Sequence, residues 1–301
     1  MPLGPRVCTA LTQDSRRPGG DMYLQHWGLD RSPFATIAFG EGRSADGREA
    51  YPTHALAEAT ARADYLVSQR RRVGVLLGGH GWGKTSTAAA VAAEQRRNGS
   101  QVVLLDAVGV TARELLFRVA EGFDTQPDPG DCQMRLWRRI EDRLAENRWQ
   151  DRATVLIVDD AEQLGPDSQQ QLVRLARLES DPASRWTLLL TTSPESLERL
   201  SPPLLHLIDL RIDLAPWDAS DTVGYIQTSL VDAGRFEPIF SEAALSLLHE
   251  LTRGVPRHVA RLADFALLAG AAKHADGVDE ATIEQAFAEM KWTPGGMALA
   301  G

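Results

Sequence analysis

One glycine-rich segment restricts the fold of this chain more than any other feature. Residues Gly78 to Thr85, with the sequence GGHGWGKT, match the pattern GxxxxGK[ST] at every defined position. The apolar run Val73–Leu77 precedes the segment, and the alanine-rich run Ser86–Ala93 follows it. Because strand, loop and helix in this order are the context in which the pattern holds nucleotide phosphates, the sequence predicts a phosphate-binding loop here.

The residues of this loop have separate expected tasks. Glycines let successive backbone N–H groups point at phosphate oxygens, and the start of the following helix adds the positive end of its dipole. We expect Lys84 to contact the β and γ phosphates of ATP and Thr85 to bind Mg²⁺. Trp82 either covers the nucleotide or packs on a neighbour. A glycine-rich turn without a ligand is the alternative, and it leaves the lysine and the hydroxyl unexplained. The predicted contacts to ATP are Gly78, Gly79, His80, Gly81, Trp82, Gly83, Lys84, Thr85 and Ser86.

A second motif that indicates a nucleotide site is an apolar run that ends in two carboxylates. Val155–Val158 is followed directly by Asp159 and Asp160. A buried strand would deliver Asp159 to the carboxyl edge of a parallel sheet, where it could hold Mg²⁺ together with Thr85. Asp160 is the candidate base that polarises the attacking water, although aspartate is one methylene shorter than the usual glutamate. Glu162 is an alternative base if the chain stays extended.

Strand patterns alternate with helical patterns over the first two thirds of the chain. This alternation predicts an α/β fold of the P-loop NTPase class, with a parallel five-stranded sheet covered on both faces. The predicted strands are Val73–Leu77, Val102–Asp106, Thr154–Asp159, Thr187–Thr191 and Ile208–Leu214. The predicted helices between them are Thr85–Arg97, Ala112–Gly122, Asp131–Asn147, Asp167–Leu178 and Glu195–Leu200.

Strand patterns stop after Pro216, and only helical patterns follow. We therefore predict an α/β domain over residues 22–216 and a C-terminal all-helical lid over residues 217–292. The first 21 residues are rich in Pro, Gly, Ser and Arg and are predicted to be disordered, whether or not Met22 is the true start. Residues 293–301 are expected to fray. The predicted lid helices are Ser220–Ala233, Ser241–Arg253, Pro256–Lys273 and Asp279–Met290, with N-caps at Ser220, Ser241 and Asp279 and a stop at Gly254.

Composition narrows the function classes. The formal net charge of -9 disfavours generic nucleic-acid binding, although Arg70–Arg72 and Arg96–Arg97 are short basic runs. No apolar run approaches the ~20 residues that span a bilayer, and no secretory leader is evident, so we expect a cytoplasmic protein without a transmembrane segment. Cys8 and Cys132 lack the spacing of metal or redox sites and are expected to be unpaired thiols.

These motifs together resemble those of the ExeA-type AAA+ ATPases, a group linked to the general secretion pathway. Tyr23–Phe34 resembles the N-terminal signature of the group, and Asp159 to Glu162 stand where the family has Asp-Glu-Ala-Gln. Gly254-Val-Pro-Arg257 resembles the Gly-x-Pro-Arg of the family's lid. The resemblance extends from about residue 22 to about residue 290, and the transposition ATPases of the TniB and MuB kind share much of this layout.

The resemblance implies further roles. Arg257 would be the sensor arginine that reaches the γ phosphate from the lid, and Leu29–Phe34 would lie near the adenine. The arginine that the family places before the fifth strand, a candidate finger in a homo-oligomer, aligns here with Leu207, and neither Arg199 nor Arg211 stands at the expected place. A polar sensor at the end of the fourth strand would be one of Thr191, Thr192 and Ser193, and we predict that it is Thr192.

Three functional hypotheses follow. The first is an AAA+ ATPase that hydrolyses ATP with Mg²⁺ to remodel a protein or nucleoprotein partner, with Lys84, Asp160, Thr192 and Arg257 as catalytic residues. The second is a switch that holds nucleotide with little hydrolysis. The third is a DNA-associated adaptor akin to the transposition ATPases. The partner, the pathway and the size of any homo-oligomer do not follow from the sequence.

Overall fold

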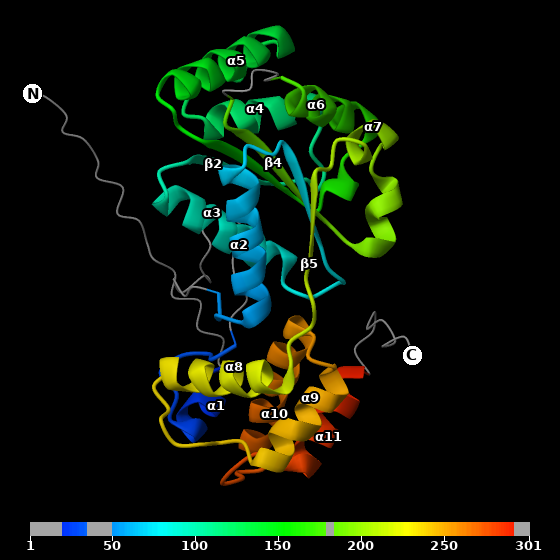
Figure 1. Cartoon of the computed structure of the whole chain (residues 1–301). Coiled ribbons are helices and arrows are strands. Elements are labelled where there is room, and N and C mark those ends of the chain that lie inside the picture. The colour runs from blue at the N-terminus through cyan, green and yellow to red at the C-terminus, as the bar shows by residue number, and fades with distance from the viewer. Residues whose placement is uncertain (1–19, 35–49, 179–183, 292–301) are drawn as a thin grey trace, which may run out of the picture.

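Five parallel strands form the central sheet of the computed structural model, which describes residues 20–34, 50–178 and 184–291 (Figure 1). The spatial order of the strands is β2-β3-β4-β1-β5, so the strand that leads into the glycine-rich loop lies inside the sheet. This confirms the predicted parallel five-stranded sheet. The bounds are β1 Val73–Leu77, β2 Gln101–Asp106, β3 Thr154–Asp159, β4 Trp186–Thr192 and β5 Leu210–Asp213.

Helices cover both faces of this sheet. Alternate residues of each strand enter one of two hydrophobic clusters, as expected for a strand whose side chains point to opposite faces. One face packs against α2 (His54–Ser68) and α3 (Lys84–Arg97). The other face packs against α4 (Ala112–Gly122), α5 (Gln133–Trp149) and α6 (Pro166–Ala176), as Figure 1 shows. A short helix, α7 (Pro202–Leu205), precedes β5, and two short 3₁₀ helices cover Ala161–Gln163 and Pro194–Arg199.

Several predicted elements differ in extent from the observed ones. Helix α2 was not predicted, and the segment predicted as a helix over Glu195–Leu200 is a 3₁₀ turn. The fifth strand is Leu210–Asp213, shorter than the predicted Ile208–Leu214, although the backbone N–H groups of Asp209 and Leu214 still donate to the carbonyl oxygens of Val73 and Leu77 in β1. This short strand lies at an edge of the sheet, next to β1.

The C-terminal helices form a separate cluster below the sheet (Figure 1). They are α8 (Ala219–Asp232), α9 (Glu242–Thr252), α10 (Pro256–Ala272) and α11 (Glu280–Lys291). Ser241 and Asp279 accept hydrogen bonds from N–H groups of the following turn, as predicted for N-caps. Asp218, and not Ser220, caps α8, since the N–H of Asp221 donates to Asp218 Oδ1 at 2.7 Å.

The N-terminal helix α1 (Gly20–Trp27) packs with these lid helices and not with the sheet. Trp27 is buried, its indole Nε1 donates to the carbonyl oxygen of Leu267 at 2.8 Å, and its ring lies on Gly270. The prediction that residues 22–216 form one α/β domain therefore needs a correction for residues 22–34. The predicted disordered tail also ends too late, because α1 begins at Gly20. The rest of that tail and residues 293–301 lie outside the described residues.

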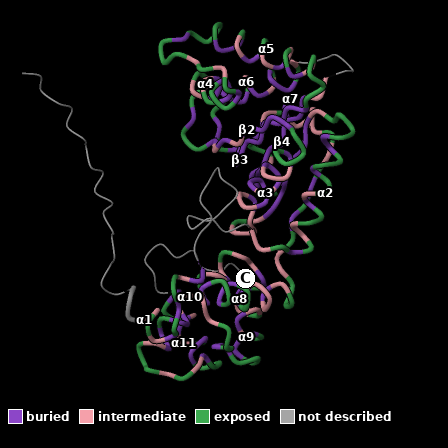
Figure 2. The backbone as a smooth tube through the Cα atoms, turned by 90° about the vertical axis from the view of Figure 1, so that its left-hand side faces the viewer, coloured by how far each residue is buried: buried purple, intermediate pink, exposed green. Residues whose placement is uncertain are grey.

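Buried residues form separate cores in the sheet part and in the lid part. Figure 2 shows buried backbone along the strands, with exposed positions on the outer sides of α2 and α5. Cys132 lies exposed at the start of α5 with a free thiol. None of the described helices combines the length and apolar character that crossing a membrane requires.

Candidate functional site

The glycine-rich loop connects β1 to α3 and has a backbone that only some residues tolerate. Gly81 and Gly83 have φ values of 79° and 89°, in the left-handed region that favours glycine. A Cβ on Gly79 would lie 2.7 Å from the indole of Trp82, so this indole folds over the loop itself. Trp82 also lines the cavity beside the loop, so both roles considered for it stay predictions. The N–H groups of Gly81 and Gly83 donate no hydrogen bond to a described residue.

Lys84, the first residue of α3, curls back over this loop. Its side chain is only 8 % exposed, and Nζ donates to the carbonyl oxygens of Gly78 at 3.1 Å and Gly79 at 3.4 Å. The loop thus holds the ammonium group beside its own backbone, at the N-terminal end of a 14-residue helix. Free N–H groups, a helix dipole and a cation all favour an anion here.

Asp159 ends β3 and connects the loop to the neighbouring strands. Thr85 Oγ1 donates to Asp159 Oδ2 at 2.6 Å, and Thr191 Oγ1 of β4 donates to Asp159 Oδ1. Burial raises the pKa of the Asp159 carboxyl above its usual range, while both hydroxyl donors act in the opposite direction. The predicted pair of magnesium ligands, Thr85 and Asp159, is therefore brought together in the structure.

The threonine that contacts this carboxylate is Thr191, and not the candidate Thr192. Thr191 also accepts a hydrogen bond from the backbone N–H of Asp160 at 3.0 Å. The Thr192 hydroxyl is fully buried and points to the carbonyl oxygen of Ser193 at 3.4 Å. Because β3 and β4 pair with Val158 opposite Leu190, the next position brings Thr191 to Asp159. The register therefore brings Thr191, and not Thr192, to the carboxylate of Asp159.

Asp160 follows Asp159 and faces the cavity beside the glycine-rich loop. Its backbone is left-handed, with φ 50° and ψ 47°, and its side chain lines the cavity between the loop and the lid. Burial, and then the charge of Glu162, raise the pKa of its carboxyl. Glu162 itself is buried, does not line this cavity, and has an Oε2 without a hydrogen-bond partner in the described part of the chain. Asp160 and not Glu162 therefore faces the site.

The lid reaches the loop through the start of α10. The N–H of Arg257 donates to the carbonyl oxygen of Gly81 at 3.2 Å, and a Cβ on Gly81 would lie 3.0 Å from Arg257 Cβ. The predicted sensor arginine therefore lies beside the phosphate-binding loop. Arg211 instead pairs with Asp213 on an exposed edge, where Nη2 and Oδ1 are 2.7 Å apart. Neither Arg211 nor Arg199 lines the cavity.

A cavity of about 640 Å³ lies between the loop and the lid. Its walls include His80, Ser86 and the rest of the loop from Gly81 onward, and Phe34 of the stretch expected near the adenine. Several lining residues were not predicted from the sequence, among them Tyr51, Trp217, Tyr225 and Asp264. Asp264 follows Arg257 by seven residues on one helix, and that spacing is the signal that could have found it.

The residues present fit a nucleoside triphosphate with Mg²⁺. The loop offers free N–H groups and a buried ammonium, and the adjoining cavity has the volume of a small-molecule site. Thr85 and Asp159 present oxygen atoms, which are the ligands Mg²⁺ prefers. Among the described residues no cluster of three or more His, Cys, Asp or Glu forms an all-protein metal site.

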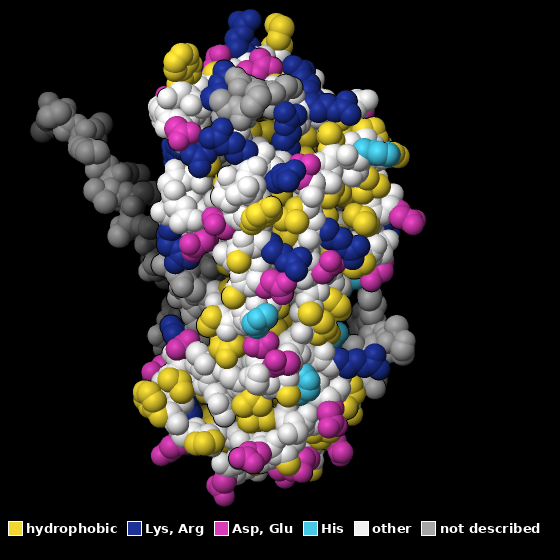
Figure 3. Space-filling view, viewed as in Figure 1, with side chains coloured by type: hydrophobic (Ala, Val, Ile, Leu, Met, Phe, Trp, Pro, Cys, Tyr) yellow, Lys and Arg dark blue, Asp and Glu magenta, His cyan; other side chains and the backbone are white. Residues whose placement is uncertain are grey.

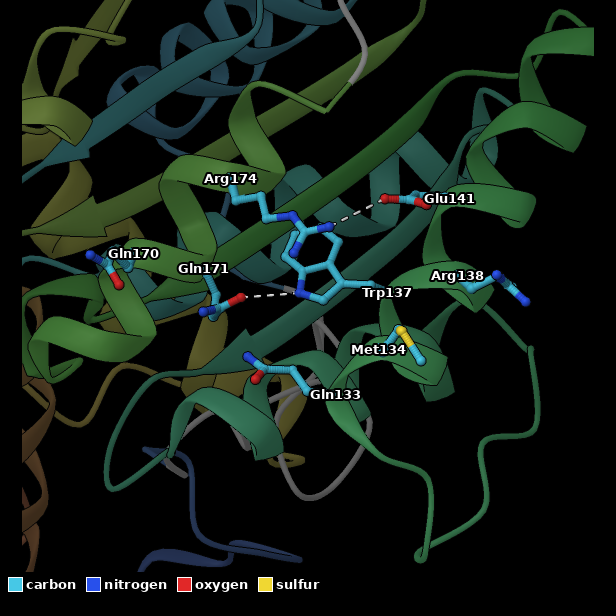
Figure 4. A pocket seen from close by; sticks show the side chains of 8 residues that line it. All are labelled: Gln133, Met134, Trp137, Arg138, Glu141, Gln170, Gln171 and Arg174. Carbon is cyan, nitrogen blue, oxygen red and sulfur yellow. Dashed lines mark hydrogen bonds and ion pairs between the residues drawn. The ribbon is translucent and has the colours of Figure 1, made fainter.

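A second hollow of about 580 Å³ lies between α5 and α6, at the other end of the α/β part. Figure 4 shows the Arg174 guanidinium stacked on the ring of Trp137, at 3.8 Å from its centroid. The Trp137 indole donates to Gln171 at 3.1 Å, and Arg174 pairs with Glu141 at 3.6 Å. These contacts satisfy each other and assemble no nucleophile or acid–base pair.

Comparisons with known proteins agree with this geometry. The family described as AAA domain matches residues 67–200. General secretion pathway protein A of Aeromonas hydrophila is 30% identical over 292 residues, which cover 93% of this chain and 52% of that protein. The chain thus spans about half the length of this relative.

Solved structures support the fold alone, because their sequence identities are low. The Orc1 protein of Aeropyrum pernix, solved in complex with DNA, has 21% identity and a TM-score of 0.60 over 80% of this chain and 66% of that one. Cdc6p of Pyrobaculum aerophilum has 18% identity and a TM-score of 0.59, over 82% and 67% of the two chains. The RuvB branch migration motor of Thermotoga maritima has 16% identity and a TM-score of 0.54, over 80% and 70%.

Proposed function

Given that this chain belongs with the ExeA-type AAA ATPases, we propose that it hydrolyses ATP with Mg²⁺ and uses the lid to pass the nucleotide state to a partner. One observation carries this proposal. Thr85, Asp159 and Thr191 form a hydrogen-bonded row beside the glycine-rich loop, and Arg257 of the lid touches the same loop. Loop, sheet edge and lid therefore meet around one cavity.

Each residue would have a separate role. Lys84 would hold the β and γ phosphates, and Thr85 and Asp159 would hold Mg²⁺, which neutralises phosphate charge when bound. Asp160 would orient the attacking water and accept its proton, because it is the carboxylate that faces the cavity. Thr191 would fix the orientation of Asp159 and of the Asp160 backbone. Arg257 would respond to the γ phosphate and move with α10.

Removal of Asp160 tests hydrolysis. We expect the wild type to release phosphate in a Mg²⁺-dependent manner and Asp160→Ala to lower kcat by ~100-fold, since a positioned general base contributes ~10²–10⁴. Steady-state phosphate release measures this, with nucleotide binding followed in parallel. Asp167→Ala, which removes an exposed carboxylate from α6, is the matched control and should keep full activity. A wild type without Mg²⁺-dependent turnover would contradict the enzyme and favour the nucleotide switch.

The nucleotide switch is the second candidate, and two observations favour it. Asp160 is shorter than the glutamate usual at this place, and Arg199 and Arg211 lie away from the cavity. A switch would bind ATP through Lys84 and close the lid through Arg257, and the affinity of the partner would depend on the lid position.

A cytoplasmic location, a homo-oligomer and an unknown protein partner stay predictions.

A nucleoprotein partner is a further candidate, and surface charge supports it locally. Figure 3 shows Lys and Arg side chains gathered over the upper end of the molecule, around α4 to α6, whereas Asp and Glu dominate the lid. Arg138 of α5 lies in this upper part, and its exposed side chain forms no hydrogen bond or ion pair with another described residue. Such a face would attract phosphates in spite of the net charge of the whole chain.

A DNA mobility shift tests this candidate. We expect duplex DNA to be retarded at low salt in the presence of ATP, with an affinity that falls as salt rises. Arg138→Glu should weaken the retardation several-fold, while the exposed lid substitution Arg253→Glu should not. Failure to retard DNA at low salt would dismiss a DNA partner.

A further inference from the structure

Helix α10 presents one row of side chains to the nucleotide cavity. Arg257, Ala260, Arg261 and Asp264 all line it, at spacings of three, four and seven residues that place them on one helix face. The Arg257 end is fixed at the loop by the contact with Gly81. At 1.5 Å per residue, Asp264 lies about 10 Å further along the helix. A triphosphate gripped by the loop would therefore direct its base toward the Asp264 end.

Aromatic side chains form another part of the same cavity. Phe34, Tyr51, Trp217 and Tyr225 all line it, and the rings of Trp217 and Tyr225 have centroids 4.8 Å apart. Tyr51 contacts both of these rings, at 6.1 Å from Trp217 and 5.8 Å from Tyr225. Its hydroxyl lies against Gly224, where a Cβ would overlap it. A half-buried aromatic wall of this kind suits a flat heterocycle.

Asp264 is the one carboxylate that the lid contributes to this cavity. Its Oδ1 accepts a long hydrogen bond, 3.5 Å, from the Tyr23 hydroxyl, and within the described residues it has no other hydrogen bond and no ion pair. Burial raises the pKa of this carboxyl. A half-buried carboxylate with so few donors is costly unless a ligand supplies one.

We propose that Asp264 selects the base of the nucleotide, because its carboxylate accepts a hydrogen bond from the exocyclic amino group of adenine. The inference rests on the proposed ATP site and adds the group that distinguishes ATP from other triphosphates. The phosphates are held at the far end of α10 by the loop, so Asp264 contributes to base discrimination and not to phosphate affinity. Arg257 and Asp264 thus divide one helix face between the two ends of the nucleotide.

Competitive binding of three triphosphates tests this assignment. The probes are ATP, the purine riboside triphosphate that lacks the 6-amino group, and 2′-deoxy-ATP. We expect the wild type to bind the purine analogue about 10- to 100-fold more weakly than ATP, as for the loss of one hydrogen bond to a charged group. It should bind 2′-deoxy-ATP nearly as tightly as ATP. Asp264→Leu should lower ATP affinity to that of the analogue, so that the ratio of the two approaches one.

Further variants separate this contact from folding and from the phosphate site. Asp264→Asn keeps an oxygen acceptor and should retain part of the discrimination, while the exposed lid substitution Asp276→Leu should retain all of it. Equal wild-type affinities for ATP and the purine analogue would overturn the inference. So would full discrimination in Asp264→Leu, or a loss that follows the 2′-hydroxyl. A wild type that binds none of the three probes would overturn the proposed ATP site itself, which a loss of discrimination alone would not.

Discussion

Replacing Lys84 with alanine is expected to lower the affinity for ATP by at least ~100-fold. The ammonium is buried against the loop, and its only hydrogen bonds in the described structure go to the carbonyl oxygens of Gly78 and Gly79. Charge-assisted bonds to phosphate are each worth about 1.5–3 kcal/mol, so losing two of them removes two decades of affinity or more. The fold should persist, because no distant element relies on this side chain.

Calorimetric titration with ATP and Mg²⁺ measures the loss, and thermal melting checks the fold. Saturating ATP should stabilise the wild type by about 2.7 kcal/mol at a hundred times Kd, and Lys84→Ala by almost nothing at the same concentration. Lys273→Ala, an exposed lysine at the end of α10, is the matched control and should behave as wild type. A Lys84→Ala protein that binds ATP within a factor of three of wild type would contradict the proposed site.

The central sheet could be predicted because its strands combine strong local signals. Val73–Leu77 and Thr154–Asp159 were predicted with the observed bounds, since uninterrupted apolar runs next to a glycine-rich loop or a pair of carboxylates have few other interpretations. The glycine-rich pattern could also be interpreted from its neighbours, because an apolar run precedes it and a helix-forming run follows it. Its predicted partners Asp159 and Arg257 lie beside it in the structure.

Helix α2 was missed because its buried face is built from small residues. Ala59, Ala63, Leu66 and Val67 are buried at helical spacing, but two alanines give little apolar contrast against an alanine-rich background. The signal that could have found the helix is its N-cap, where Thr53 Oγ1 accepts from the N–H of Leu56 at 3.1 Å.

The choice between Thr191 and Thr192 depended on information that one strand does not contain. Both are buried in β4, and which of them faces Asp159 is set by the register between β3 and β4. The lining of the cavity could not be predicted for the same reason. Phe34, Trp217 and Asp264 are far apart in the chain and come together only when the lid packs. Long-range packing of this kind leaves no local pattern.

Gly254 is the position at which the lid is tied to the segment that leaves the sheet. The N–H of Trp217, between β5 and α8, donates to the carbonyl oxygen of Gly254 at 2.9 Å. Gly254 has φ 66°, and a Cβ placed on it would overlap the carbonyl oxygen of Trp217. Arg257, three residues further on, touches the phosphate-binding loop. One turn therefore joins the lid, its connection to the sheet and the nucleotide site.

Gly254→Ala is accordingly expected to destabilise the protein by about 3 kcal/mol or more. The left-handed backbone alone costs a residue with a side chain about 1–2 kcal/mol, and the overlap is with backbone, which no rotamer change relieves. At roughly 2–4 °C per kcal/mol, the melting temperature should fall by at least about 6 °C, and ATP affinity should fall with it because Arg257 shifts. Gly165→Ala is the matched control, since Gly165 has φ -66° and open space around the added methyl group. If both variants melt together with the wild type, the turn tolerates a side chain, and the rigid link from Trp217 through Gly254 to the phosphate-binding loop does not exist.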